Sequence, residues 1–164
     1  MAQYSRKEFE AKVRLGENLE NVDLSNLDLR NAKLRGANLS KSKLTSVRLS
    51  GADLRQTNLS KADMAWANLD RANLEGTDLT ETILYNSSLQ EADLSNANLT
   101  RVDLGEANLT KANLTGANLS EAELSQTNLT DANLSGANVR GSNIDQALMT
   151  KSAVDLRGAT RPDG

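Results

Sequence analysis

An apolar residue recurs at every fifth position over almost the whole chain. The series starts at Leu19 and reaches Val154 without a break in phase, and 23 of its 28 positions are leucine. The other members are Met64, Val139, Ile144, Met149 and Val154. A fixed internal period of this kind is the strongest indication of the architecture in a sequence.

The positions before each central residue repeat as well. Two residues earlier the side chain is mostly small, as in Ala32, Ala37 and Thr57. One residue earlier, asparagine or aspartate occupies 20 of the 28 positions. The unit therefore reads A(D/N)Lxx.

A period of five fits neither a single helix nor a single strand. In a helix, five residues turn the stripe by about 140°, so the leucines would spiral around every side. In a strand, side chains alternate with period two, so an odd spacing sends successive leucines to opposite faces. A chain that turns at each repeat points all of them at a common axis.

The A(D/N)Lxx run over residues 17–156 resembles the pentapeptide repeat family. This resemblance implies an all-β fold, a right-handed quadrilateral β-helix with four pentapeptides per coil and about seven coils. With coils about 4.8 Å apart, the rod would be about 34 Å long. Leucine-rich repeats fit less well, because their period of 20–29 residues spaces the leucines unevenly.

The two ends predict caps for this rod. Residues 5–8, Ser-Arg-Lys-Glu, have capping-box spacing, Phe9 and Val13 lie one helical turn apart, and Gly16 suits a helix end. We expect a short helix at residues 6–14 over the first coil. The expected organisation is a helical cap at 1–16, the β-helix at 17–156 and a loose tail at 157–164.

Residues twenty apart should stack on one face of a four-sided coil. One column then alternates in charge and predicts an ion ladder: Arg71, Glu91, Lys111, Asp131 and Lys151. A corner column of glycines suits turns with positive φ: Gly36, Gly76, Gly116 and Gly136. An asparagine column predicts ladder hydrogen bonds: Asn18, Asn38, Asn58, Asn98, Asn118 and Asn138.

One face differs from the others in charge and in apolar content. Its only base is Lys43, and its acids are Asp23, Asp63, Asp103, Glu106, Glu123 and Asp145. The same face carries Trp66, Ile83 and Tyr85, which we expect to cluster in the open. Apolar aromatics ringed by acids predict an interaction site formed by Trp66, Ile83, Tyr85, Asp63, Asp103, Glu106 and Glu123. The alternative is that Trp66 lies flat along a corner and only covers a coil edge.

Composition argues against catalysis. The chain has no histidine and no cysteine, so its many hydroxyl groups have no usual base to activate them. Leucine fills the interior, which leaves no concave site for paired carboxylates. We therefore expect no enzyme activity, no cofactor and no metal. The charged N-terminus lacks the apolar run of a secretory signal, so a cytoplasmic location is expected.

Three functions remain, and the first is favoured. The chain is expected to be a protein-interaction module that uses the acidic aromatic face, as a monomer or weak homodimer, with neither nucleic acid nor membrane as partner. A passive rod or spacer is the alternative. Family members linked to quinolone resistance resemble duplex DNA and engage DNA gyrase, but one charge per 1.7 Å would require roughly 20 negative charges over such a rod. The net charge here is -3.

Overall fold

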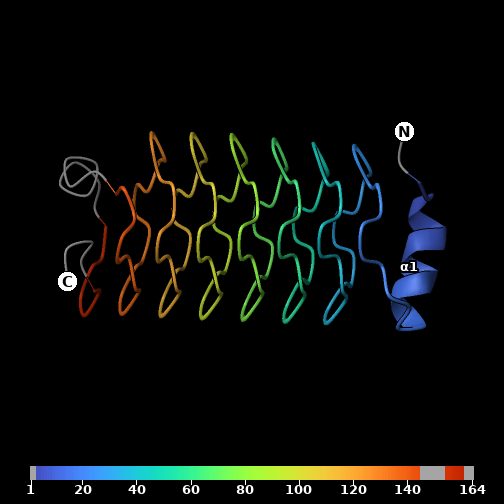
Figure 1. Cartoon of the computed structure of the whole chain (residues 1–164), viewed down its shortest axis with the longest axis horizontal. Coiled ribbons are helices and arrows are strands. Elements are labelled where there is room, and N and C mark those ends of the chain that lie inside the picture. Colours follow the sequence, from blue (N-terminus) through green and yellow to red (C-terminus); the bar gives the residue numbers. More distant parts are fainter. Residues whose placement is uncertain (1–2, 145–153, 161–164) are drawn as a thin grey trace.

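The computed structural model describes residues 3–144 and 154–160. These residues form one helix, α1 (Arg6–Arg14), and a row of similar coils stacked into a rod (Figure 1). The extended segments are isolated parallel bridges rather than longer strands, and they join residues 20 apart, from Asp23↔Lys43 to Asn118↔Asn138. Four five-residue units therefore complete each coil, as the resemblance to the pentapeptide repeat family implies. In the described ranges no helix has the length and apolar character needed to cross a bilayer.

Backbone hydrogen bonds connect each repeat to the coils on both sides. Met64 N–H donates to the carbonyl oxygen of Ile83 in the next coil at 2.8 Å, and Asp63 N–H donates to Ser42 in the preceding coil at 3.0 Å. The carbonyl of Met64 accepts the N–H of Ala67 at 3.0 Å, which closes a turn before the next repeat. Each pentapeptide is thus one short bridge and one corner.

Where the residue before a central position is asparagine or aspartate, its side chain satisfies a backbone donor that this ladder does not reach. Asn58 Oδ1 accepts the N–H of Ser60 at 3.0 Å, and Asp103 Oδ1 accepts that of Gly105 at 2.9 Å. A short side-chain oxygen in this place mimics a backbone turn. The preference for asparagine or aspartate at this position therefore has a local structural cause.

Every corner, and not only the glycine column, uses the left-handed backbone. In the described residues, 19 non-glycine residues have φ between 54° and 62°, and all lie two positions past a central residue. The sequence pattern predicts positive φ for the glycine column only, whereas all corner columns have it. Left-handed geometry costs an L-residue roughly 1–2 kcal/mol, so the stacking of coils must offset that cost at each corner.

The core is a stack of the central side chains. From Leu19 to Val139 each of them is at most 3% exposed. The small residues beside them are buried too, and where threonine replaces alanine its hydroxyl is bonded: Thr77 Oγ1 donates to the carbonyl of Leu54 at 2.8 Å. Each buried leucine contributes roughly 1.5–3 kcal/mol, which makes up for the shortage of aromatic residues.

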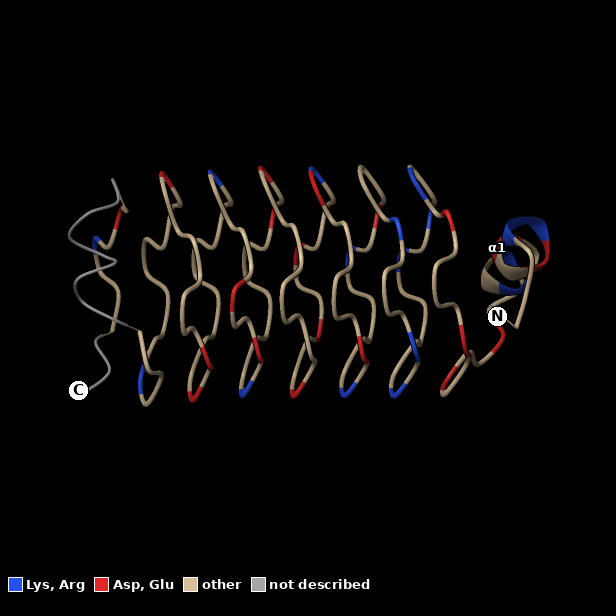
Figure 2. Ribbon diagram, turned by 90° about the horizontal axis from the view of Figure 1, so that it is seen from above, with Lys and Arg blue, Asp and Glu red and all other residues tan. Residues whose placement is uncertain are grey.

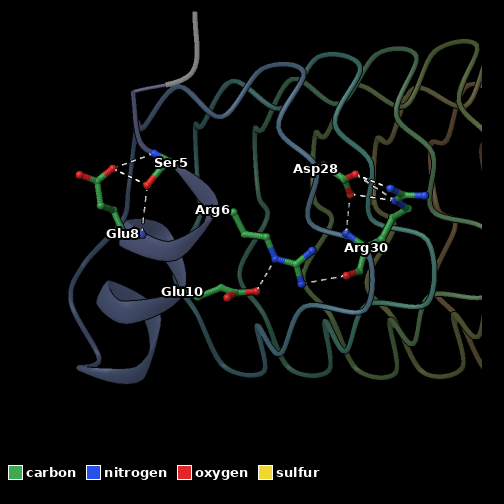
Figure 3. Close-up of polar contacts among 6 residues, drawn as sticks. All are labelled: Ser5, Arg6, Glu8, Glu10, Asp28 and Arg30. Carbon is green, nitrogen blue, oxygen red and sulfur yellow. Dashed lines mark hydrogen bonds and ion pairs between the residues drawn. The ribbon is translucent and has the colours of Figure 1, made fainter.

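Helix α1 lies across the N-terminal end of the rod (Figure 1). Ser5 forms a reciprocal capping box with Glu8, and the fully buried Phe9 belongs to the same hydrophobic core as the leucines. Arg6 joins the helix to the first coil, because its Nη2 donates to the carbonyl of Arg30 at 3.0 Å while its Nε donates to Glu10 (Figure 3). The helix has the bounds expected from the sequence.

The five-residue phase breaks near the C-terminus, which corrects the prediction of an unbroken series. Leu134 N–H donates to Asp155, 21 residues ahead, whereas Leu114 N–H donates to Asn133, 19 residues ahead. The last bridges, Asn133↔Asp155 and Asn138↔Thr160, join residues 22 apart. Leu156, not Val154, therefore takes the central position, and Val154 takes that of the small residue. Met149 lies outside the described residues.

Backbone pairing also runs past the expected start of the tail. Gly136 N–H donates to the carbonyl of Arg157 at 2.9 Å, and Thr160 N–H donates to that of Ala137 at 2.9 Å. Residues 157–160 thus continue the last coil, and the boundary drawn after residue 156 was placed too early.

The alternating charge column forms only part of the expected ladder. Arg71 Nε lies 3.1 Å from Glu91 Oε2, but Lys111 and Asp131 form no ion pair within the described residues. Lys151 lies outside them. A second corner column adds the pairs Lys61–Glu81 and Arg101–Glu121. Figure 2 shows charged residues of both signs along the edges of the rod, where each exposed pair contributes only about 0.2–1 kcal/mol.

Candidate functional site

Ile83 is an exposed apolar residue in a column of charged ones. It is 43% exposed and pairs with Asp63 on one side and Asp103 on the other. Isoleucine has no oxygen to accept the N–H two residues ahead, and that N–H, of Tyr85, has no acceptor among the described residues. The exchange of the usual asparagine for isoleucine therefore gives up one hydrogen bond and places an apolar side chain on the surface.

Tyr85 lies against the next coil instead of standing free. Its hydroxyl donates to Glu106 Oε1 at 2.6 Å, and this bond to a carboxylate raises the pKa of Tyr85. Its ring covers Gly105, where an added Cβ would lie 3.1 Å from Tyr85 Cδ2. Tyr85 is therefore half-buried and held in place by its own face.

Gly105 is the site residue that sequence reasoning missed. Its φ is not positive, so glycine is needed here because a side chain would not fit, and not because of the backbone conformation. The signal was available, because Gly105 follows Tyr85 by twenty residues and no other position directly after a leucine of the repeat carries glycine. A ring from one coil fills the place that a side chain would occupy in the next.

The four acids predicted for the site form no ion pair, although Lys43 is the neighbour of Asp63 in the backbone ladder. Asp63, Asp103, Glu106 and Glu123 form no ion pair with any described residue within 4.0 Å. Hydrogen bonds from Ser125 and then Asn143 lower the pKa of Glu123. In residues 3–144 and 154–160 no three acidic side chains come together to hold a metal ion. Asp145, the last acid counted on this face, lies outside the described residues.

Trp66 lies one coil before Tyr85, and its N–H donates to the carbonyl of Tyr85 at 3.0 Å. It is 57% exposed, at a left-handed corner with φ of 56°. It lines an open groove on the adjacent face, in which Arg48 and Asn68 also take part and neither Ile83 nor Tyr85 does. Trp66 therefore borders this groove from a corner that is also next to Tyr85.

A family profile matches most of this chain. The profile described as "Pentapeptide repeats" matches residues 18–51, 48–86, 84–116 and 107–146, with 8 copies. No curated protein matches the sequence.

Several solved structures are similar to this chain. HetL, involved in heterocyst differentiation regulation in the cyanobacterium Nostoc sp. strain PCC 7120, is 31% identical over 96% of this chain and 80% of its own, with a TM-score of 0.50. Rfr23 from the cyanobacterium Cyanothece 51142 is 37% identical over 58% of this chain and 61% of its own, with a TM-score of 0.47. QnrB1, a plasmid-mediated fluoroquinolone resistance protein, is 21% identical over 88% of this chain and 82% of its own, with a TM-score of 0.58. At that identity QnrB1 shares the fold alone.

The repeat profile covers most of the chain, and HetL is similar over nearly all of it. The coil of four pentapeptides and the stacked leucine core agree with both comparisons. This chain belongs to the pentapeptide repeat family, whose members fold as right-handed quadrilateral β-helices.

Proposed function

We propose that this chain is a non-enzymatic protein-interaction module that binds a basic partner segment through its acidic face. Proteins of the family are generally structural or interaction modules. The proposed surface is the acidic patch, defined here as Ile83 and Tyr85 with Asp63, Asp103, Glu106 and Glu123.

One observation carries this proposal. An exposed isoleucine replaces the residue that would complete its turn, and the carboxylates around it form no ion pair within 4.0 Å among the described residues. An apolar contact enclosed by charges of one sign is the pattern of a binding centre with a polar rim. A basic segment that carries one apolar side chain would complement both features.

The test is a pull-down with the purified, tagged chain. One variant is Ile83→Asn, and the other combines Asp63→Asn with Asp103→Asn. Asparagine is common at these positions and can still accept the turn hydrogen bond, so the variants should fold. Glu75→Gln removes an exposed acid from another face and serves as the control.

We expect the same bound protein to be recovered with the wild type and with Glu75→Gln, and to be lost with both patch variants. Recovery of the same protein by all four chains would contradict the proposal. Thermal unfolding followed by circular dichroism would show whether any loss reflects misfolding instead.

A passive rod or spacer is the second candidate, and the polar ladders favour it. Asn38 Nδ2 donates to Asn18 Oδ1 at 2.8 Å, and Asn118 Nδ2 donates to Thr100 Oγ1 at 2.9 Å. Such side chains bond to one another along the rod and leave few groups for a partner. A rod would behave identically in all four pull-downs. A DNA-mimic role has the least support, because the net charge is only -3. A cytoplasmic location stays a prediction.

A further inference from the structure

The groove beside Trp66 has a chemistry opposite to that of the acidic patch. It is open, has a volume of about 490 Å³, and is lined by Trp66, Arg48, Ser50 and Asn68 among others. It lies on the face of Leu29, Leu49 and Leu69, next to the acidic one. A ligand in this groove would therefore not depend on the function proposed for the acidic patch.

Arg48 stands where the repeat normally carries asparagine or aspartate. It pairs with Asp28 and Asn68 through the backbone ladder. The carboxylate of Asp28 is already engaged by Arg30, whose Nη2 lies 2.6 Å from Asp28 Oδ2. Within the described residues the guanidinium of Arg48 has neither an ion pair nor a hydrogen bond. An arginine that lines a groove without a partner is available to a ligand.

The same substitution leaves a backbone donor open. Arginine has no side-chain oxygen, so the N–H of Ser50 lacks the turn acceptor that Asn58 provides to Ser60. No described group accepts the N–H of Ser50, whose hydroxyl donates to Asn68 Oδ1 instead. The groove thus offers a guanidinium and a backbone N–H beside an exposed indole ring.

We propose that this groove binds a peptide segment of a partner in which a carboxylate lies next to an apolar side chain. Arg48 and the N–H of Ser50 receive the carboxylate, because a guanidinium matches its planar geometry. Trp66 packs against the apolar side chain, in keeping with the frequent role of tryptophan and arginine as binding centres.

The surroundings favour one carboxylate over a chain of phosphates. The adjoining groove on this face shares Arg30 and Ser50 and is also lined by Asp70, Arg71 and Glu91. Both of its arginines already pair with acids, Arg30 with Asp28 and Arg71 with Glu91, whereas the binding of a nucleic acid relies on many free cations. A short peptide segment of mixed polarity places one carboxylate at Arg48 and avoids the acids of the adjoining groove.

The test uses the fluorescence of Trp66, the only tryptophan of the chain. The probes are two blocked peptides without aromatic residues, acetyl-Gly-Glu-Leu-Glu-Gly-amide and its lysine counterpart. Arg48→Asn restores the common residue of the repeat, so it removes the guanidinium and supplies an acceptor to Ser50 without threatening the fold. Lys33→Asn is the matched control, because Lys33 holds the same repeat position on another face and pairs with Asp53.

We expect the glutamate peptide to shift the emission of Trp66 in the wild type and in Lys33→Asn. We expect Arg48→Asn to bind it at least about ten-fold more weakly, and calorimetry to show a similar loss for Trp66→Ala. Equal binding by Arg48→Asn, equal binding of the lysine peptide, or no shift with the wild type would each overturn the proposal. Tighter binding of a single-stranded oligonucleotide than of the glutamate peptide would also overturn it.

Discussion

Phe9 offers a direct test of how α1 holds the first coil. Its side chain is fully buried in the same core as the leucines. A phenylalanine buries about 150–250 Å², which at about 25 cal/mol per Å² corresponds to about 4–6 kcal/mol. Phe9→Ala should therefore cost about 3–5 kcal/mol, the usual range for this change in a core. If this cost exceeds the free energy with which α1 docks on the first coil, the helix detaches. The loss of stability then equals that docking free energy and goes no further.

Native-state hydrogen exchange would distinguish local from global loss. The N–H of Leu24 donates to Lys43 in the first coils, and that of Leu94 donates to Asn113 in the middle of the rod. Because repeats contact mainly their neighbours, Phe9→Ala should lower the protection of Leu24 far more than that of Leu94. Phe9→Leu keeps an apolar side chain and should cost less than about 1.5 kcal/mol. Unchanged protection of Leu24 in Phe9→Ala would show that α1 does not stabilise the coil beneath it.

Four further outcomes follow from the same structure. Leu94→Asp should unfold the middle coils, at a cost of about 5 kcal/mol or more, because it buries an unpaired charge, and loss of the circular dichroism signal would record it. Gly36→Ala and Gly51→Ala should lower Tm by similar amounts: both have left-handed φ, and the oxygen that a Cβ would meet at Gly51 belongs to the exposed side chain of Asn31, which can rotate away. Hydrogen bonds from Arg30 lower the pKa of Asp28 from 3.8 to about 2. The stability that Asp28 contributes is therefore complete above its unfolded pKa and is lost as pH falls through about 2. An NMR titration should show a higher midpoint for Asp28 in Arg30→Gln. In a supercoiling assay the chain should not inhibit DNA gyrase, since its net charge is -3; strong inhibition would show that charge pattern outweighs total charge.

Much of the candidate site was visible in the sequence as departures from the repeat. Ile83 stands where an asparagine or aspartate is expected, and its partial exposure follows from its place beside an inward-pointing leucine. Trp66 is exposed as expected, and its grouping with Ile83 and Tyr85 into one interaction site stays a prediction. A corner residue lies between two faces, and only the packing of neighbouring coils decides toward which face a large side chain turns. The position of the Tyr85 ring over Gly105 depended on the same kind of contact between coils.

The sequence by itself determined the period, the leucine core and the bounds of α1, because each repeat and the capping box around Ser5 encode their local geometry within a few residues. The tertiary structure decided what depends on partners about twenty residues away. The last coil shows this most clearly: Met149 and Val154 continue the apolar series, yet Leu156 occupies the central position because Asp155 pairs with Asn133. An apolar residue at the expected spacing satisfies the pattern whether or not it points inward, whereas backbone pairing with the preceding coil permits one register only.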